Sequence, residues 1–99
     1  MPREVRLIVR WLIEGTRGGR LRARILLLLR DGPMNAHQLA RSLGVNYRTA
    51  THHLRVLQEH GLVERLGDGY GSPYVLTSLA EEAWPVIEES IRKVLGGGK

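Results

Sequence analysis

The chain contains 99 residues, carries a formal net charge of +5 and has no cysteine. Its length predicts one small domain, and a domain of this size buries only about 60–70 % of its unfolded surface, so association with a second copy would add useful stability. The missing cysteine excludes disulfides and thiolate metal ligands, and the positive charge favours an anionic partner.

No segment approaches the ~20 consecutive apolar residues of a membrane span. The first residues also lack the apolar core and small-residue cleavage site of a secretion signal. We therefore expect a cytoplasmic protein that has no membrane partner.

Apolar residues recur along Arg3–Glu14 at two different spacings. Helical spacing is kept by Val5, Ile8, Val9 and Leu12. Strand-like alternation is kept by Val5, Leu7, Val9, Trp11 and Ile13. The length of the segment and the glycine that follows it favour a helix, and a strand stays open as the alternative.

A glycine-containing hinge at Thr16–Gly19 precedes a strongly apolar helix predicted at Arg20–Arg30. Asp31-Gly32-Pro33 ends this helix, because the residue before a proline avoids the helical conformation. Met34 then has room for only a very short strand.

Two short helices joined by a tight turn are predicted at 35–60. Asn35 is a good N-cap, and Gln38 completes a capping-box pattern. Gly44 stands where a left-handed residue is needed, and Asn46 caps the second helix, Tyr47–His60. The buried face of that second helix should consist of Ala50, Leu54 and Leu57.

The last third of the chain predicts a hairpin and a helix. Strands at Leu62–Gly67 and Pro73–Thr77 flank a turn-rich tip. Ser78 should cap the final helix, with Glu81 at the capping-box position, and Pro85 should kink or divide that helix. We expect the tail at Gly96–Lys99 to be disordered.

The order of these elements resembles a winged helix-turn-helix domain over Leu21–Thr77. The most specific residues are HHLRVLQEHGLVERLGDG at His52–Gly69 and YVLT at Tyr74–Thr77. They resemble ArsR-type and related archaeal winged-helix transcriptional regulators. The resemblance implies a three-helix core with a small β-hairpin. With the helices predicted before and after it, the chain should have a mainly α fold with extra N- and C-terminal helices. The resemblance also implies a homodimeric repressor or activator whose third core helix enters the major groove of double-stranded DNA.

The exposed face of the predicted recognition helix, residues 47–60, supports this interpretation. Its side chains suit base edges and phosphates, since arginine can read guanine with two hydrogen bonds and threonine offers a hydroxyl and a methyl group. The predicted DNA-binding residues on this face are Tyr47, Arg48, Thr51, His52 and Arg55. A solvated surface helix with no ligand is the alternative.

The predicted wing, residues 62–77, offers Arg65, Tyr70 and Ser72. We expect Arg65 and Tyr70 to contact DNA along the phosphate backbone, because the tip itself has no lysine or arginine to enter the minor groove. Arg65 could instead pair with a neighbouring carboxylate, Glu64 or Asp68.

Neither a metal site nor a catalytic site is predicted, and no cofactor is expected. The four histidines are His37, His52, His53 and His60, and their spacing does not bring three ligands to one ion. We expect His53 to pack beside Leu54 and bond a backbone carbonyl. No serine or threonine stands in a motif with a histidine and an acid, so an enzyme is not expected.

The chain divides on this interpretation into an N-terminal dimerisation segment and hinge (1–19), a DNA-binding domain (20–77) and a C-terminal dimerisation helix with its tail (78–99). The apolar residues left over after the core is built predict the homodimer interface. They are Val5, Ile8, Val9, Leu12, Leu79, Val86, Ile87, Ile91 and Val94.

An effector is not identified by the sequence. If a small-molecule pocket exists, we expect it between the end helices and the core, where Trp11 and Trp84 lie, although both tryptophans could simply pack in an interface. Two other functions stay open. One is a winged-helix module that binds protein in the transcription machinery, and the other is a general nucleic-acid-binding protein.

Overall fold

The computed structural model describes residues 1–96, and residues 97–99 of the predicted disordered tail lie outside the described part. The helices are α1 (Arg3–Glu14), α2 (Gly19–Arg30), α3 (Ala36–Leu43), α4 (Tyr47–Glu59), α5 (Ser78–Glu82) and α6 (Trp84–Leu95). The strands are β1 (Met34–Asn35), β2 (Val63–Arg65) and β3 (Pro73–Leu76). No helix within residues 1–96 is long and apolar enough to cross a membrane.

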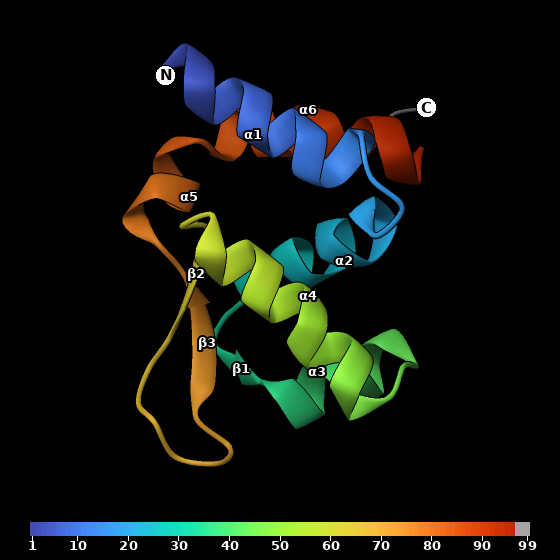
Figure 1. Ribbon diagram of the computed structural model, residues 1–99, viewed down its shortest axis with the longest axis vertical. Helices are drawn as coiled ribbons and strands as arrows, with labels where there is room; N and C mark the ends of the chain where they lie inside the picture. The colour runs from blue at the N-terminus through green and yellow to red at the C-terminus, as the bar shows by residue number, and fades with distance from the viewer. Residues whose placement is uncertain (97–99) are drawn as a thin grey trace.

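The elements are arranged along the long axis of the molecule. Helices α1 and α6 lie side by side at one end (Figure 1). The loop between β2 and β3 reaches the opposite end, and α2 and α4 lie between the two ends (Figure 1). The expected architecture, a helical core with a wing and additional terminal helices, is therefore confirmed.

The ambiguous first segment is a helix, α1, over the predicted residues. It buries Val9, Leu12 and Ile13 in the core. Leu7 and Trp11, which produced the strand-like alternation, are exposed on its outer side. The apparent alternation thus reflects a helix that is apolar on two faces.

Helix α2 begins one residue before the predicted start and crosses close to the end of α1. A Cβ atom on Gly19 would lie 1.8 Å from the carbonyl oxygen of Ile13. Only glycine allows this approach, because atoms cannot come so close without a backbone shift. Beyond it, Ile25, Leu26 and Leu29 fill the centre of the core.

The predicted helix-turn-helix is confirmed in its capping details. The Asn35 side chain accepts a hydrogen bond from the Gln38 amide at 2.8 Å, and the Gln38 side chain accepts one from the Asn35 amide at 2.8 Å. Gly44 has a φ of 72°, and the Asn46 side chain accepts from the Thr49 amide at 2.8 Å. These local contacts define where α3 ends and α4 begins.

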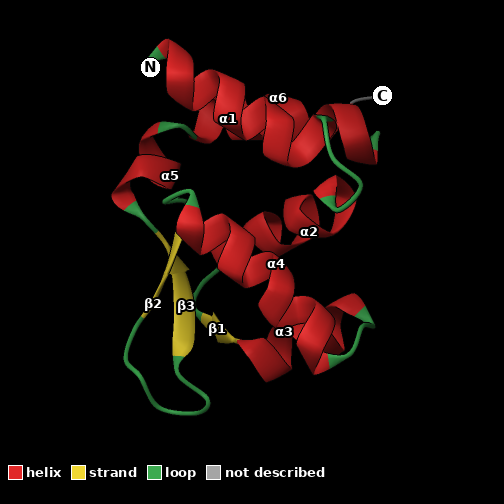
Figure 2. Ribbon diagram, viewed as in Figure 1, coloured by secondary structure: helices red, strands yellow, loops and turns green. Residues whose placement is uncertain are grey.

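The hairpin belongs to a three-stranded antiparallel sheet in the order β1-β3-β2 (Figure 2). Strand β3 is central, with Met34 opposite Tyr74 on one side and Arg65 opposite Tyr74 on the other. The predicted short strand at Met34 therefore exists, and it attaches the wing to the start of α3.

The predicted final helix starts differently from the expectation. The cap is Thr77, whose hydroxyl accepts from the Ala80 amide at 3.1 Å and donates to the Gly61 carbonyl at 2.6 Å. Ser78 is already inside α5. The same segment divides at Ala83, so that Pro85 falls in the first turn of α6, where its missing N–H costs no helical hydrogen bond. Division at the proline was one of the two predicted outcomes.

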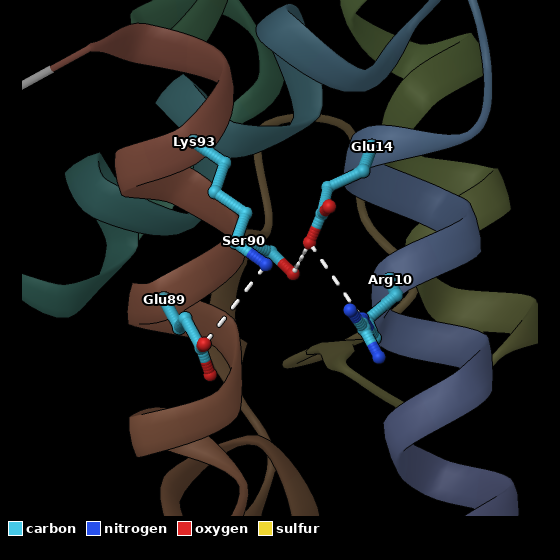
Figure 3. A network of polar contacts seen from close by, with 5 residues as sticks. All are labelled: Arg10, Glu14, Glu89, Ser90 and Lys93. Carbon is cyan, nitrogen blue, oxygen red and sulfur yellow. Dashed lines mark hydrogen bonds and ion pairs between the residues drawn. The ribbon is translucent and has the colours of Figure 1, made fainter.

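A small polar contact joins the two end helices (Figure 3). The buried Ser90 hydroxyl of α6 donates to the Glu14 carboxylate of α1 at 2.5 Å, and Arg10 lies 4.0 Å from the same oxygen. The neighbouring Lys93–Glu89 pair is 3.9 Å apart and belongs to α6 alone (Figure 3). The Ser90–Glu14 hydrogen bond therefore links α1 to α6 in addition to their apolar packing.

Several residues of the predicted dimer interface are instead buried in the core of the single chain. Val9, Leu12 and Ile87 are fully buried, and Val86 and Ile91 are nearly so, inside this single chain. These side chains are buried where α1 packs on α6, so in this arrangement they cannot contact a second copy of the chain. Val5, Leu79 and Val94 are half-buried, and Ile8 is exposed.

Candidate nucleic-acid interface

Helix α4 has one buried face and one exposed face. Ala50, Leu54 and Leu57 are buried as predicted, which leaves Arg48 and Arg55 exposed on the opposite side of the helix. The helix ends at Glu59, one residue before the predicted end, and His60 is its C-cap. No acidic residue lies in its first turn, so the positive N-terminal end of the helix is not offset there.

A groove of about 320 Å³ separates α4 from the sheet. Arg55 comes from α4 and Arg65 from β2, so the two guanidinium groups stand on different walls. Among the residues that the structure describes, no carboxylate lines this groove, which suits an anionic group such as a phosphate. The lining residues are Tyr47, Thr51, Arg55, Gln58, Arg65 and Tyr74.

Four of the seven predicted DNA-binding residues therefore come together, namely Tyr47, Thr51, Arg55 and Arg65. Arg48 is exposed on the same helix outside the groove. Their contact with DNA stays a prediction, but the fold assembles them from two elements on one side of the molecule.

His52 and Tyr70 do not line this groove. His52 borders a second cavity beside the loop between α1 and α2, on the other edge of the exposed face of α4. Tyr70 is at the tip of the wing and is 80 % exposed.

Arg65 holds the wing and pairs with no acid within the described residues. Its guanidinium donates to the Gly69 carbonyl at 2.8 Å, and the Ser72 hydroxyl donates to the same oxygen at 2.7 Å. The predicted alternative, an ion pair with Glu64 or Asp68, is therefore wrong. The backbone acceptor leaves the charge of Arg65 uncompensated.

An aromatic cluster connects the wing tip to both helices of the helix-turn-helix. The His37 ring of α3 stacks on Tyr47 of α4 with centroids 4.4 Å apart. Tyr70 meets His37 edge-on at 5.0 Å and hydrogen-bonds its Nε2 through the phenol oxygen. We call His37, Tyr47 and Tyr70 the wing-tip cluster.

Three residues of this surface were missed at the level of sequence. Gln58 lies one turn beyond Arg55, so extending the helical spacing would have found it. Tyr74 enters the groove because it pairs with Arg65 across the sheet, which no local pattern reveals. His37 was weighed only as a metal ligand, whereas it packs between two tyrosines.

The other histidines also differ from expectation. The hydrogen-bond partner that the structure gives His53 is a guanidinium nitrogen of Arg22, 3.1 Å from its Nδ1, in place of the expected backbone carbonyl. His60 is the histidine that contacts a carbonyl, that of Val56 at 2.9 Å. Within residues 1–96 no three ligating side chains gather around one point.

The three-helix core, the capped turn and the three-stranded sheet define the winged helix-turn-helix class. The family model of the methanogenesis regulatory protein FilR1, N-terminal domain, matches residues 12–83. The chain belongs to that family.

Solved winged-helix structures superpose on most of the chain. The homodimeric winged helix-turn-helix DNA-binding domain Mb0332 from Mycobacterium bovis, a possible ArsR-family regulator, has a TM-score of 0.68 at 22% identity, covering 95% of this chain and 82% of that one. Lactococcus lactis ZitR in complex with DNA has a TM-score of 0.60 at 26% identity, covering 78% and 55%. These likenesses confirm the expected fold.

The protein RV1404 from Mycobacterium tuberculosis has a TM-score of 0.65 at 20% identity, covering 94% of this chain. The chain spans 65% of the length of that structure, just under two thirds. Among curated protein sequences, none matches.

Proposed function

We propose that the protein is a sequence-specific, double-stranded DNA-binding transcriptional regulator that acts as a homodimer. The observation that carries this proposal is the exposed arginine face of α4 beside a carboxylate-free groove. Helix α4 enters the major groove, where Arg48 and Arg55 reach base edges or phosphates. The wing lies along the backbone, with Arg65 and the wing-tip cluster facing phosphate.

Family membership supports the proposal, since the matching family is that of a regulatory protein. Two superposed proteins support it further: ZitR is seen in complex with DNA, and Mb0332 is a homodimeric DNA-binding domain. A protein with a chromosomal target of this kind belongs in the cytoplasm, and it binds rather than catalyses.

The homodimer is proposed to form at the end of the molecule that carries α1 and α6. Leu7, Ile8 and Trp11 are exposed there on α1. Residues 1–19 and 78–99 would thus supply the dimer contacts, with 20–77 as the DNA-binding domain. The opposite end, with the wing, stays free (Figure 1).

The test is a salt titration of binding to a duplex selected from a random library and to an unselected duplex. A sequence-specific regulator binds the selected duplex at least ~10³-fold more tightly, and binding to both duplexes weakens with salt. Equal affinity for both duplexes would identify a general nucleic-acid-binding protein. No binding to either would favour a protein-binding winged helix.

A further inference from the structure

A second cavity, of about 600 Å³, opens between the α1–α2 loop and α4. We call it the loop cavity. Its volume lies within the range of small-molecule sites in proteins. The residues that line it are Trp11, Thr16, Arg17, Gly18, Leu21, Arg22, His52, His53 and Val56. Of the two tryptophans expected near a pocket, only Trp11 lines it, because Trp84 is buried beneath the guanidinium of Arg30.

The cavity contains a buried cation, Arg22, that has no anionic partner among residues 1–96. Arg22 is only 4 % exposed, and no carboxylate lies within 4.0 Å of it in the described chain. Its guanidinium donates to the Leu12 carbonyl at 3.0 Å and to the Thr16 hydroxyl. Burial lowers the pKa of Arg22 from its usual value. Buried charges are normally paired, so an unpaired guanidinium at a cavity wall favours the binding of an anion there.

The third partner of Arg22 is His53 of α4, 8 % exposed. Because an arginine can only donate, the His53 Nδ1 atom, 3.1 Å away, must accept. The imidazole is therefore neutral and carries its proton on Nε2. Desolvation by burial, together with the nearby positive charges of Arg22 and His52, lowers the pKa of His53 to about 4.

Glycine keeps the loop tight against this pair. A Cβ atom on Gly18 would lie 2.5 Å from the His53 ring and 2.6 Å from the Arg22 guanidinium. The loop between α1 and α2 thus touches the same two side chains that link α2 to α4. Anything that changes the Arg22–His53 contact therefore acts on the helix proposed to enter DNA.

From these observations we propose that the loop cavity binds a small organic carboxylate with an apolar body. Arg22, assisted by Arg17 at the rim, holds the carboxylate with charge-assisted hydrogen bonds. Trp11, Leu21 and Val56 cover the apolar body. Binding changes the DNA affinity of α4 through His53. Only this regulatory consequence rests on the proposed function; the binding site does not.

The binding test uses benzoate and the uncharged benzamide, at equal ionic strength and without DNA. Benzoate should change the fluorescence of Trp11, and benzamide should bind at least ~10-fold more weakly, because it has no negative charge and only one acceptor oxygen for the arginines. The fluorescence response should persist in Trp84→Phe and vanish in Trp11→Phe. The pKa of His53, followed by NMR, should rise when benzoate compensates the charge of Arg22.

Two exposed arginines provide a matched pair of variants. Arg17→Ala should weaken benzoate binding about tenfold, whereas Arg24→Ala, on α2 outside the cavity, should leave it unchanged. Both retain the buried Arg22 and should fold. Absence of a benzoate response in the wild type, or an equal response to benzamide, would overturn the proposed site.

A separate measurement tests the regulatory step. Benzoate at saturation should change the affinity for the selected duplex at least ~5-fold relative to benzamide at the same ionic strength. Benzoate binding with unchanged DNA affinity would overturn the regulation and leave the site intact. Failure of DNA binding itself would appear without benzoate, and so would be distinguished from failure of the site.

Discussion

Arg22 and His53 show how a single side-chain contact escapes a prediction based on sequence. Each lies in a helix whose spacing predicted the correct aliphatic core, but a buried arginine that donates to a neutral histidine depends on how α2 meets α4. Nothing local to either residue signals the other, because 31 positions separate them in the chain.

The pH dependence of stability should report this histidine. The pKa of His53 is about 4 in the folded chain against an ordinary value of 6.5, so the unfolded chain binds the proton first. The contribution of His53 to the free energy of unfolding should be complete above pH 6.5 and fall by about 3 kcal/mol as the pH drops toward about 4. Chemical denaturation across this range gives the measurement.

His53→Gln isolates the contribution of this residue, because glutamine can still accept from Arg22 but does not titrate. The variant should lose less stability than the wild type between neutral pH and about pH 4, while carboxylates titrate alike in both. Identical slopes for wild type and variant would mean that His53 is not held neutral by its surroundings.

At the scale of elements, the parts of the fold that depend on neighbours in the sequence were predictable. The capping box at Asn35, the left-handed Gly44 and the division near Pro85 follow from residues within four positions of one another. The cap at Thr77 was missed because its hydroxyl is also anchored to the distant Gly61 carbonyl. The pairing of β1 with β3, the groove and the wing-tip cluster likewise depend on contacts between residues far apart in the chain.

The wing-tip cluster should restrain the wing. Tyr70 is 80 % exposed, so its contacts with His37 and Tyr47 contribute little to overall stability, but they tether the tip to α3 and α4. Tyr70→Ala should leave the thermal midpoint nearly unchanged and lower the backbone order parameters of residues 67–71 below about 0.6 on the ps–ns scale.

Tyr70→Phe serves as the control, because it keeps the ring contacts and removes only the hydroxyl. It should retain more order at the tip than Tyr70→Ala does. NMR relaxation on both variants makes the comparison, and a wing tip as ordered in Tyr70→Ala as in the wild type would show that the cluster does not hold it.

At the scale of the whole molecule, the two ends have different surfaces. The α1–α6 end exposes Leu7, Ile8 and Trp11. The loop of the wing forms the other end, and the groove lies between α4 and the sheet. A two-fold dimer built at the first end would present two recognition helices, which a palindromic site can accept when they are about 34 Å apart. A single chain has one α4 and can therefore contact only one half of such a site.

The dimer should be disrupted by a charge on the exposed side of α1. Light scattering should give about 22 kDa for the wild type, twice the chain mass of 11.1 kDa, and about half that value for Leu7→Asp or Ile8→Asp. Leu12 and Ile87 are unsuitable for this test, because a charge there would destroy the core of a single chain. A folded Leu7→Asp/Ile8→Asp protein that still dimerises would contradict this interface.

Two variants that lose equal charge test most directly whether the arginine face of α4 reads DNA. Arg48→Ala/Arg55→Ala removes two arginines from α4, and Arg3→Ala/Arg6→Ala removes two from α1 at the opposite end. Both should first be shown to keep the mass of the wild type. Affinity for the selected duplex is then measured at one salt concentration.

The α4 variant should lose about 1–3 kcal/mol per arginine on the selected duplex and much less on an unselected one. The α1 variant should lose less than about twofold on either duplex, because screening weakens distant charges. Equal losses for the two variants on the selected duplex would contradict DNA reading by α4, since binding would then depend on net charge and not on the face of α4.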